Sequence, residues 1–333
     1  MIDKIKHIKK LFFKAFCFLF LIIAFSCSNN SSVKIIKLAH GLDVNHPVHK
    51  AMVLMGKELE KNSDGKMKLE IYPSSQLGSE RQCLELLQIG SLGMTKVSAA
   101  VMENFSPNMK VFGLPFLFKN KTHRFKVLDG KIGKELLDGA TKYWLKGLGY
   151  YDAGSRSFYT KEKQINTPDD LKGMKIRVME SATAMNMVSK LGGSPTPISA
   201  GELYTALQQG VVDGAENNSP TFYLSGQYEV CKYYSLDEHT AIPDVLVINT
   251  HLWNSLSKEE QKWMQMSADT SIIYQRKLWE QSENKALAAV KKAGVEVVTP
   301  DKSKFADKVK TMFDEYKEDK DVFRLIKQIQ AIN

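Results

Sequence analysis

The stretch of sequence that decides the fold is TPDDLKGMKIRVMESATAMNMVSKLGGSPTPISAGELYTALQQGVVDGAENN, residues 167–218. Helix and strand signals alternate along it. Thr167 and Asp170 have the spacing of a capping box, and Ser199 with Glu202 repeat that spacing before a second helix. Because short strands alternate with helices, the stretch predicts an α/β fold.

Two apolar runs in this stretch, Met174–Val178 and Val211–Ala215, are typical of strands covered by helices on both faces. Arg177 lies at the end of the first run and Asn217 just past the end of the second. Such sheets bind ligands at the carboxyl ends of their strands. The rigid guanidinium of Arg177 suits a carboxylate, so it either binds an anionic ligand or forms a surface ion pair with Asp or Glu.

Further motifs lie outside this stretch: IYPSSQLGSERQ at residues 71–82, FGLPFLF at residues 112–118 and a long helix after Ser257. Together with KGMKIRV and GGSPTPISAGELYTALQQGVVDGAENN, they resemble the solute-binding subunits of TRAP transporters, the DctP family. The similarity spans nearly the whole mature chain. The resemblance implies a two-lobed α/β periplasmic binding protein in which Arg177 grips the ligand carboxylate and Asn217 adds a polar contact.

The long helix is expected to span both lobes. Ser257 and Glu260 form a third capping box, and no proline or glycine follows until Gly294, which predicts a helix of about 50 Å. Its predicted apolar contacts are Trp263, Met266, Ile273 and Leu278. The chain is expected to cross between lobes at Gly154 and Ser155, where glycine supplies the freedom of a hinge. The predicted lobes are residues 34–154 plus 243–282, and residues 155–242 plus 283–333.

The first thirty residues have the pattern of a secretion signal. Five lysines precede an apolar run at residues 15–25, which is followed by Cys27. The apolar run is too short for a comfortable membrane span. We therefore predict a signal peptide at residues 1–26, a lipidated Cys27 and a tether at residues 27–33, which makes the protein a periplasmic lipoprotein. Plain cleavage into the periplasm and an uncleaved anchor are the alternatives.

The composition argues against several other classes of protein. The formal charge is +9, or +5 without residues 1–26, and no arginine-rich patch with interleaved aromatics suggests nucleic-acid binding. Cys83 and Cys231 are expected to be buried core thiols, and neither a CxxC nor an HExxH motif supports a metal site. Ser155 lacks the second glycine of a nucleophile elbow. We therefore expect neither a cofactor nor an enzyme.

Further residues are candidates for the ligand site. The resemblance implies that Arg156 reaches the ligand from the second lobe, and the alternative is a structural ion pair. Lys96 interrupts an apolar strand at residues 94–97, so it is either a surface lysine or points into the cleft. Glu180 and Glu80 are either hydroxyl acceptors or solvated carboxylates at helix starts. His46 and His40 lie in the first loop. Each of them either donates to a ligand hydroxyl or stabilises the loop.

These side chains favour a polyhydroxylated sugar acid as the ligand. Ser98 and Val101 stand where sialic-acid-binding relatives carry Glu and Arg, which counts against sialic acid. The strings MTKVSAAVMENF and DAGSRSFYT resemble those of relatives that bind hexuronates. We predict a hexuronate such as glucuronate or galacturonate, delivered to the membrane subunits of a TRAP transporter. A C4-dicarboxylate or sialic acid is the alternative ligand, and a ligand-sensing lipoprotein the alternative role.

Overall fold

The computed structural model describes residues 33–332. The predicted signal peptide, Cys27 and most of the predicted tether lie outside the described residues. Within residues 33–332, no helix has both the length and the apolar character needed to cross a membrane.

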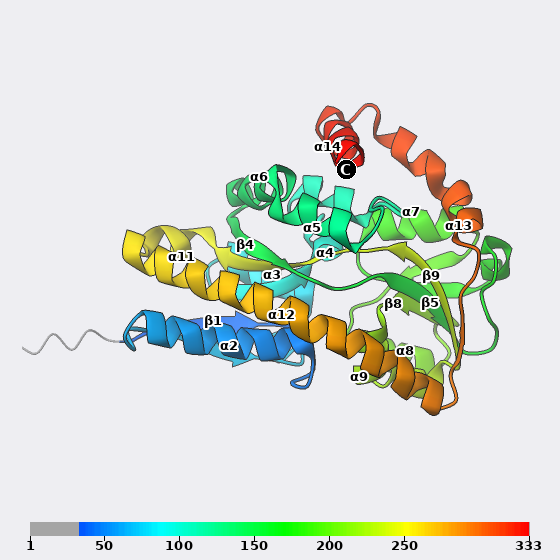
Figure 1. The fold of residues 1–333 in the computed structure, drawn as a ribbon, viewed down its shortest axis with the longest axis horizontal. Coiled ribbons are helices and arrows are strands. Elements are labelled where there is room, and N and C mark those ends of the chain that lie inside the picture. The colour runs from blue at the N-terminus through cyan, green and yellow to red at the C-terminus, as the bar shows by residue number, and fades with distance from the viewer. Residues whose placement is uncertain (1–32, 333) are drawn as a thin grey trace, which may run out of the picture. The chain divides into compact units, whose positions relative to one another are not determined.

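Two mixed β-sheets form the centres of two lobes (Figure 1), so the predicted two-lobed α/β fold is confirmed. The first sheet has the strand order β2-β1-β3-β10-β4, with bounds β1 Lys34–Ala39, β2 Met67–Tyr72, β3 Met94–Ser98, β4 Leu145–Tyr151 and β10 Asp244–Asn249. The strand β3 runs parallel to β1, whereas β10 runs antiparallel to both β3 and β4.

The second sheet has the order β11-β9-β5-β8-β6-β7. Its bounds are β5 Arg156–Thr160, β6 Lys175–Val178, β7 Ser194–Pro197, β8 Gly214–Asn217, β9 Tyr233–Thr240 and β11 Glu296–Val298. The strand β6 runs parallel to β7 and β8, and β5 runs antiparallel to β8 and β9. The predicted strand at residues 211–215 is shifted, because Asn217 is the last residue of β8 and does not follow it.

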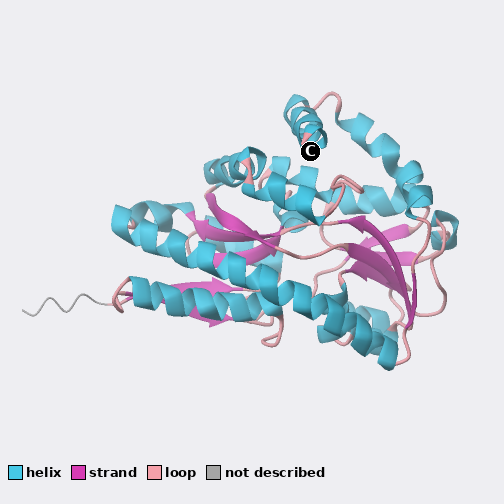
Figure 2. Cartoon of the chain, viewed as in Figure 1, coloured by secondary structure: helices cyan, strands magenta, loops and turns pink. Residues whose placement is uncertain are grey.

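Helices flank both sheets (Figure 2), and their N-terminal caps account for several boundaries. Their bounds are α2 Pro47–Asn62, α3 Glu80–Gln88, α4 Ala99–Met102, η1 Pro107–Gly113, α5 Lys121–Asp129, α6 Lys131–Gly139, η2 Ala140–Tyr143, η3 Pro168–Leu171, α7 Ala182–Lys190, α8 Leu203–Gln208, α9 Ser219–Leu224, α10 Gln227–Val230, α11 Thr250–Ser255, α13 Lys302–Val309, η4 Lys310–Tyr316 and α14 Lys320–Ala331.

Of the two capping boxes predicted in residues 167–218, one forms. Thr167 and Asp170 cap the 3₁₀ helix η3. The box predicted at Ser199 is wrong, because its hydroxyl bonds the carboxylate of Glu202 at 2.5 Å and α8 begins at Leu203 without a side-chain cap. The N-cap residue of α8 is Glu202 itself, so Ser199 lies too far before the helix start to cap it.

The helix α12, Lys258–Lys292, spans both lobes as predicted (Figure 1). Ser257 and Glu260 form its capping box, and its 35 residues extend for about 50 Å. It packs against α2 and β4 at one end and α9 at the other. Its predicted contacts are partly wrong: Met266 is 45% and Ile273 is 73% exposed.

The buried side of α12 carries small and polar side chains, together with Met264 and Trp279. Small residues such as Ala268 let α12 approach its neighbours closely, and this face has no strong hydrophobic periodicity in the sequence.

The chain crosses between the sheets from β4 to β5 and from β9 to β10. Gly154, in the first crossing, has a φ of +62°. A Cβ at this position would lie 2.5 Å from Oε1 of Glu283 and 2.9 Å from Nε1 of Trp279. Both the backbone angle and the packing therefore favour glycine where the sequence predicts a hinge. The residue boundaries of the two lobes, and the hinge itself, stay predictions.

The C-terminal helix α14 contacts elements of the predicted first lobe. It packs against η1 and α6, which belong to the predicted first lobe. The Ile329 carbonyl lies 3.0 Å from Nε2 of His123, and Arg324 forms an ion pair with Glu135 at 2.5 Å. One apolar core joins η1, α7, α13 and α14. The last residues therefore contact elements of both predicted lobes.

Candidate functional site

One cavity brings the predicted ligand-binding residues together. It contains about 680 Å³ of space not filled by protein atoms, part of it open to solvent. Elements of both sheets line it. All seven predicted side chains are among its lining residues: Arg177, Arg156, Asn217, Glu80, Lys96, Glu180 and His46.

Arg177 is a buried cation with unused donors. It is the third of the four residues of β6 and is 2% exposed. Its Nε donates to the Ile198 carbonyl at 2.7 Å, but within residues 33–332 its two terminal amino groups have no hydrogen-bond acceptor. Burial lowers the pKa of Arg177, yet a guanidinium remains charged at neutral pH. A buried charge without a close counterion favours an anionic ligand.

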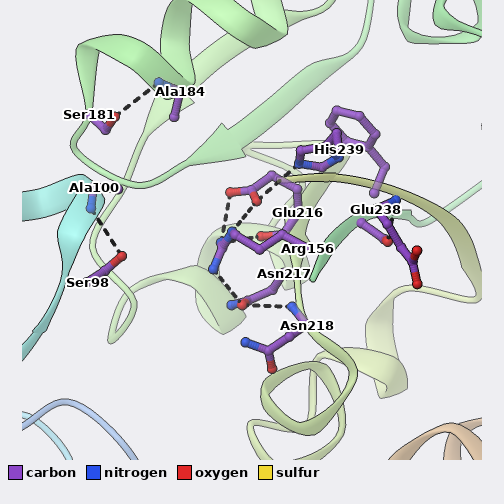
Figure 3. Close-up of polar contacts among 12 residues, drawn as sticks. Ser98, Ala100, Arg156, Ser181, Ala184, Glu216, Asn217, Asn218, Glu238 and His239 are labelled. Carbon is purple, nitrogen blue, oxygen red and sulfur yellow. Dashed lines mark hydrogen bonds and ion pairs between the residues drawn. The ribbon is translucent and has the colours of Figure 1, made fainter. Parts of the chain in front are cut away.

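Arg156, in contrast, already has a counterion (Figure 3). Its Nε and Nη2 donate to the two carboxylate oxygens of Glu216 at 2.5 and 2.9 Å, and Nη1 donates to Oδ1 of Asn217 at 2.8 Å. The structural ion pair that the sequence left open is therefore present, and Arg156 also lines the cavity. Its contact with a ligand stays a prediction.

The ion pair of Arg156 continues into a buried network that sequence reasoning missed. Nε2 of His239 lies 3.5 Å from Glu216, and Nδ1 lies 2.8 Å from Asp237. Burial favours the neutral ring, but Asp237 and Glu216 raise the pKa of His239 to about 9. Burial also opposes ionisation of Glu216, but Arg156 and His239 lower its pKa to about 2. The glutamate of the DGAEN string was the available sequence signal.

Lys96 lines the cavity from β3 of the first sheet, whereas Arg177 lines it from β6 of the second. Lys96 is 3% exposed, so it is not a surface lysine. Its Nζ donates to Oε1 of Glu80 at 2.8 Å and to Oδ1 of Asp244 at 3.1 Å. Burial alone would lower the pKa of Lys96, but the two carboxylates raise it. Glu80 also accepts from the Ser98 backbone N–H at 3.0 Å. We call Glu80, Lys96 and Asp244 the carboxylate–lysine cluster.

Asp244 was missed by the sequence analysis. It is the first residue of β10 and lies opposite Ser98 of β3 and Tyr151 of β4. Burial raises its pKa, although Lys96 counteracts this effect. An acidic residue at the start of the apolar string DVLVIN was the available signal, but its partner is Lys96, 148 residues earlier.

His46 connects the two sides of the cavity as a neutral donor. It is the N-cap of α2, and its Nδ1 accepts from the Val48 N–H at 3.3 Å. Burial lowers the pKa of His46 well below its usual value, so the ring is neutral. Because Nδ1 accepts a hydrogen bond, the ring hydrogen lies on Nε2. Nε2 lies 3.5 Å from Oγ1 of Thr221 in α9. His40 contacts His49 at 3.0 Å instead, and it is not among the residues that line the cavity.

Glu180 lies at a contact between the lobes. Its backbone carbonyl accepts from Nδ2 of Asn104 at 2.6 Å. Beside it, the buried Glu103 accepts from the Ser181 hydroxyl at 2.8 Å and the Thr183 N–H at 3.1 Å. A carboxylate from one lobe therefore binds the start of α7 in the other.

Cys83 and Cys231 are buried free thiols, as predicted. Over the described part of the chain, no group of three or more His, Cys, Asp or Glu side chains has a metal-binding arrangement.

Comparisons with known proteins agree with this geometry. Residues 38–319 match the family model "Bacterial extracellular solute-binding protein, family 7", DctP. The 2,3-diketo-L-gulonate-binding periplasmic protein YiaO of Escherichia coli is 33% identical over 250 residues, covering 75% of this chain and 76% of YiaO.

Two crystal structures of TRAP periplasmic solute-binding proteins are similar to this fold. The protein from Xanthobacter autotrophicus, with bound β-D-galacturonate, is 39% identical with a TM-score of 0.87, covering 90% of this chain and 100% of that chain. The protein from Anaerococcus prevotii, with bound D-glucuronate, is 35% identical with a TM-score of 0.88, covering 90% and 98%.

Proposed function

Because the chain belongs to the bacterial extracellular solute-binding proteins of family 7, the DctP family, we propose that it captures a hexuronate between its two lobes. Glucuronate and galacturonate are the proposed ligands, and the membrane subunits of a TRAP transporter are the proposed recipients. The family consists of transport proteins, and a catalytic role is not part of the proposal.

The observation that carries this proposal is the contrast between the two sides of the cavity. Arg177 offers four N–H donors on two terminal amino groups and forms no ion pair with the described residues. A ligand carboxylate would fit this fork in a bidentate arrangement. The opposite side offers the carboxylate–lysine cluster and the Nε2–H of His46, which suit hydroxyl groups. A uronate has one carboxylate and several hydroxyls, so its two ends match the two sides.

Asn217 and Arg156 would complete the acid-binding side. Asn217 accepts from Arg156 through Oδ1, which leaves its amide N–H₂ as a donor. Glu216 neutralises Arg156, so we assign Arg177 the main electrostatic role and Arg156 a supporting one. The bound uronates of the two similar crystal structures support this choice of ligand. The alternatives, a C4-dicarboxylate and sialic acid, match the second side less well.

The ligand would favour a closed arrangement of the lobes, because it contacts groups from both. A ligand shifts such an equilibrium only by its greater affinity for the closed form. We place the protein in the periplasm, with Cys27 as a lipid anchor. A ligand-sensing lipoprotein would have the same site, and a transport assay with the membrane subunits would distinguish the two roles.

The test is calorimetric titration of residues 28–333 with glucuronate, galacturonate, sialic acid and succinate. We expect a uronate to bind best, and Arg177→Ala to weaken its binding by about 30-fold or more, since truncating one partner of a buried charged pair costs about 2–5 kcal/mol. Arg177→Lys keeps the charge but loses the fork, so it should fall between the two. Arg324→Ala removes an exposed arginine that pairs with Glu135 and serves as the matched control. Unchanged uronate affinity in Arg177→Ala would overturn the assignment.

A further inference from the structure

The cavity has an uneven distribution of charge. On one side, Arg177 is a buried cation that forms no ion pair with a carboxylate anywhere in residues 33–332. On the other side, the carboxylate–lysine cluster combines the carboxylates of Glu80 and Asp244 with the single ammonium of Lys96. With two carboxylates and one ammonium, the cluster has a formal charge of −1, and all three side chains lie in the cavity wall.

The ammonium of Lys96 is already shared between two carboxylates and has one N–H donor left. Two of its three N–H bonds point to carboxylate oxygens at 2.8 and 3.1 Å. An incoming carboxylate would have to displace one of them or lie beside both. Lys96 is 3% exposed, so solvent screens this repulsion poorly.

Asp244 is the member of the cluster best placed to meet the ligand as an acceptor. The residue is 8% exposed and lines the cavity. Its Oδ1 accepts from Lys96, whereas Oδ2 has no donor among residues 33–332. Glu80, in contrast, uses both oxygens, one for Lys96 and one for the Ser98 N–H. A ligand hydroxyl could donate to Oδ2 of Asp244, but a ligand carboxylate could not.

We propose that the carboxylate–lysine cluster, through Asp244, makes the site selective for acids with a single carboxylate. Acids bind when the end remote from Arg177 is neutral and hydroxylated, and the corresponding diacids bind poorly; we call this selectivity the charge filter. This inference rests on the proposed function, because it assumes that Arg177 holds the first carboxylate. It makes Asp244 a specificity-determining residue. Its negative charge repels the second carboxylate of a diacid, whereas its free oxygen accepts a hydrogen bond from a hydroxyl of a sugar acid.

The experiment compares each uronate with the aldarate of the same configuration: glucuronate with glucarate, and galacturonate with galactarate. The aldarate carries a second carboxylate where the uronate has its aldehyde or hemiacetal carbon. Calorimetry on the wild-type protein should show at least about 100-fold weaker binding of the aldarate, because like charges are brought together out of water. Equal affinity of the wild-type protein for both acids would overturn the filter.

The variant Asp244→Asn keeps the shape of the side chain and removes its charge. We expect the ratio of aldarate to uronate dissociation constants to fall by about tenfold or more, whatever happens to the absolute affinities. Asp307→Asn, at a carboxylate that is 76% exposed and paired with Lys310, should leave the ratio unchanged. Glu80→Gln removes the other carboxylate of the cluster and should also lower the ratio, so the filter remains testable if Asp244→Asn does not fold.

The outcomes separate this inference from the proposed function. If the wild-type protein binds a sugar acid other than a uronate, the proposed ligand is wrong, and the same ratio is measured with that acid and its diacid. If the wild-type protein binds uronates but the charge-removing variants keep the wild-type ratio, the proposed function stands and the filter is overturned.

Discussion

Replacing Lys96 with methionine would remove the ammonium that lies between two buried carboxylates, while keeping most of the side-chain volume. Its Nζ lies 2.8 Å from Glu80 and 3.1 Å from Asp244, and the side chain is 3% exposed. Removing one partner of a buried ion pair destabilises a protein by about 3–5 kcal/mol, because the remaining charge is left uncompensated. Here two carboxylates lose one partner, so we expect the free energy of unfolding to fall by about 4 kcal/mol.

The deficit should depend on pH with a defined sign. Burial already raises the pKa of Asp244 in the folded protein, and Lys96 counteracts this effect. Without Lys96 the pKa should rise further. A carboxyl group whose pKa is higher in the folded state favours folding as it becomes protonated. The Lys96→Met protein should therefore recover part of its stability as the pH falls from about 8 to about 5.

Urea unfolding followed by circular dichroism at several pH values measures both effects. Lys310→Met, at a lysine that is 70% exposed and paired with Asp307, is the matched control and should change stability little. The reasoning is refuted if Lys96→Met is no less stable than this control. It is also refuted if the deficit of Lys96→Met is the same at pH 8 and pH 5.

Two further predictions concern groups outside the carboxylate–lysine cluster. Burial opposes protonation of His239, but Asp237 and Glu216 raise its pKa to about 9. The protonated ring therefore stabilises the folded protein fully below an unfolded pKa of about 6.5, and this stabilisation is lost as the pH rises through 9. His239→Gln should therefore unfold at lower urea than wild type at pH 6, with the gap closing near pH 9.5, and an equal gap at both pH values would contradict this. Glu103→Ala removes the carboxylate that accepts from the Ser181 hydroxyl and the Thr183 N–H at the start of α7, while the N-cap residue Ser181 remains, and it should cost about 1–3 kcal/mol in thermal unfolding. A wild-type melting curve would show that the contact contributes nothing.

The amino-acid sequence by itself determined the features that depend on neighbouring residues. The capping box at Ser257 and the absence of proline and glycine after it were enough to predict the helix that spans both lobes. The apolar run that ends near Arg177 was enough to predict a strand and to place this arginine at its end. Chain-wide resemblance then gathered seven residues that line one cavity.

The tertiary structure alone decided which charges are matched. Arg156 and Arg177 look alike in sequence, but antiparallel pairing of β5 with β8 places Glu216 against Arg156, while Arg177 keeps free donors. Asp244 meets Lys96 because β10 returns beside β3. Such contacts depend on strand order and register, which join residues far apart in the chain, whereas local sequence patterns report only on neighbours within a few residues.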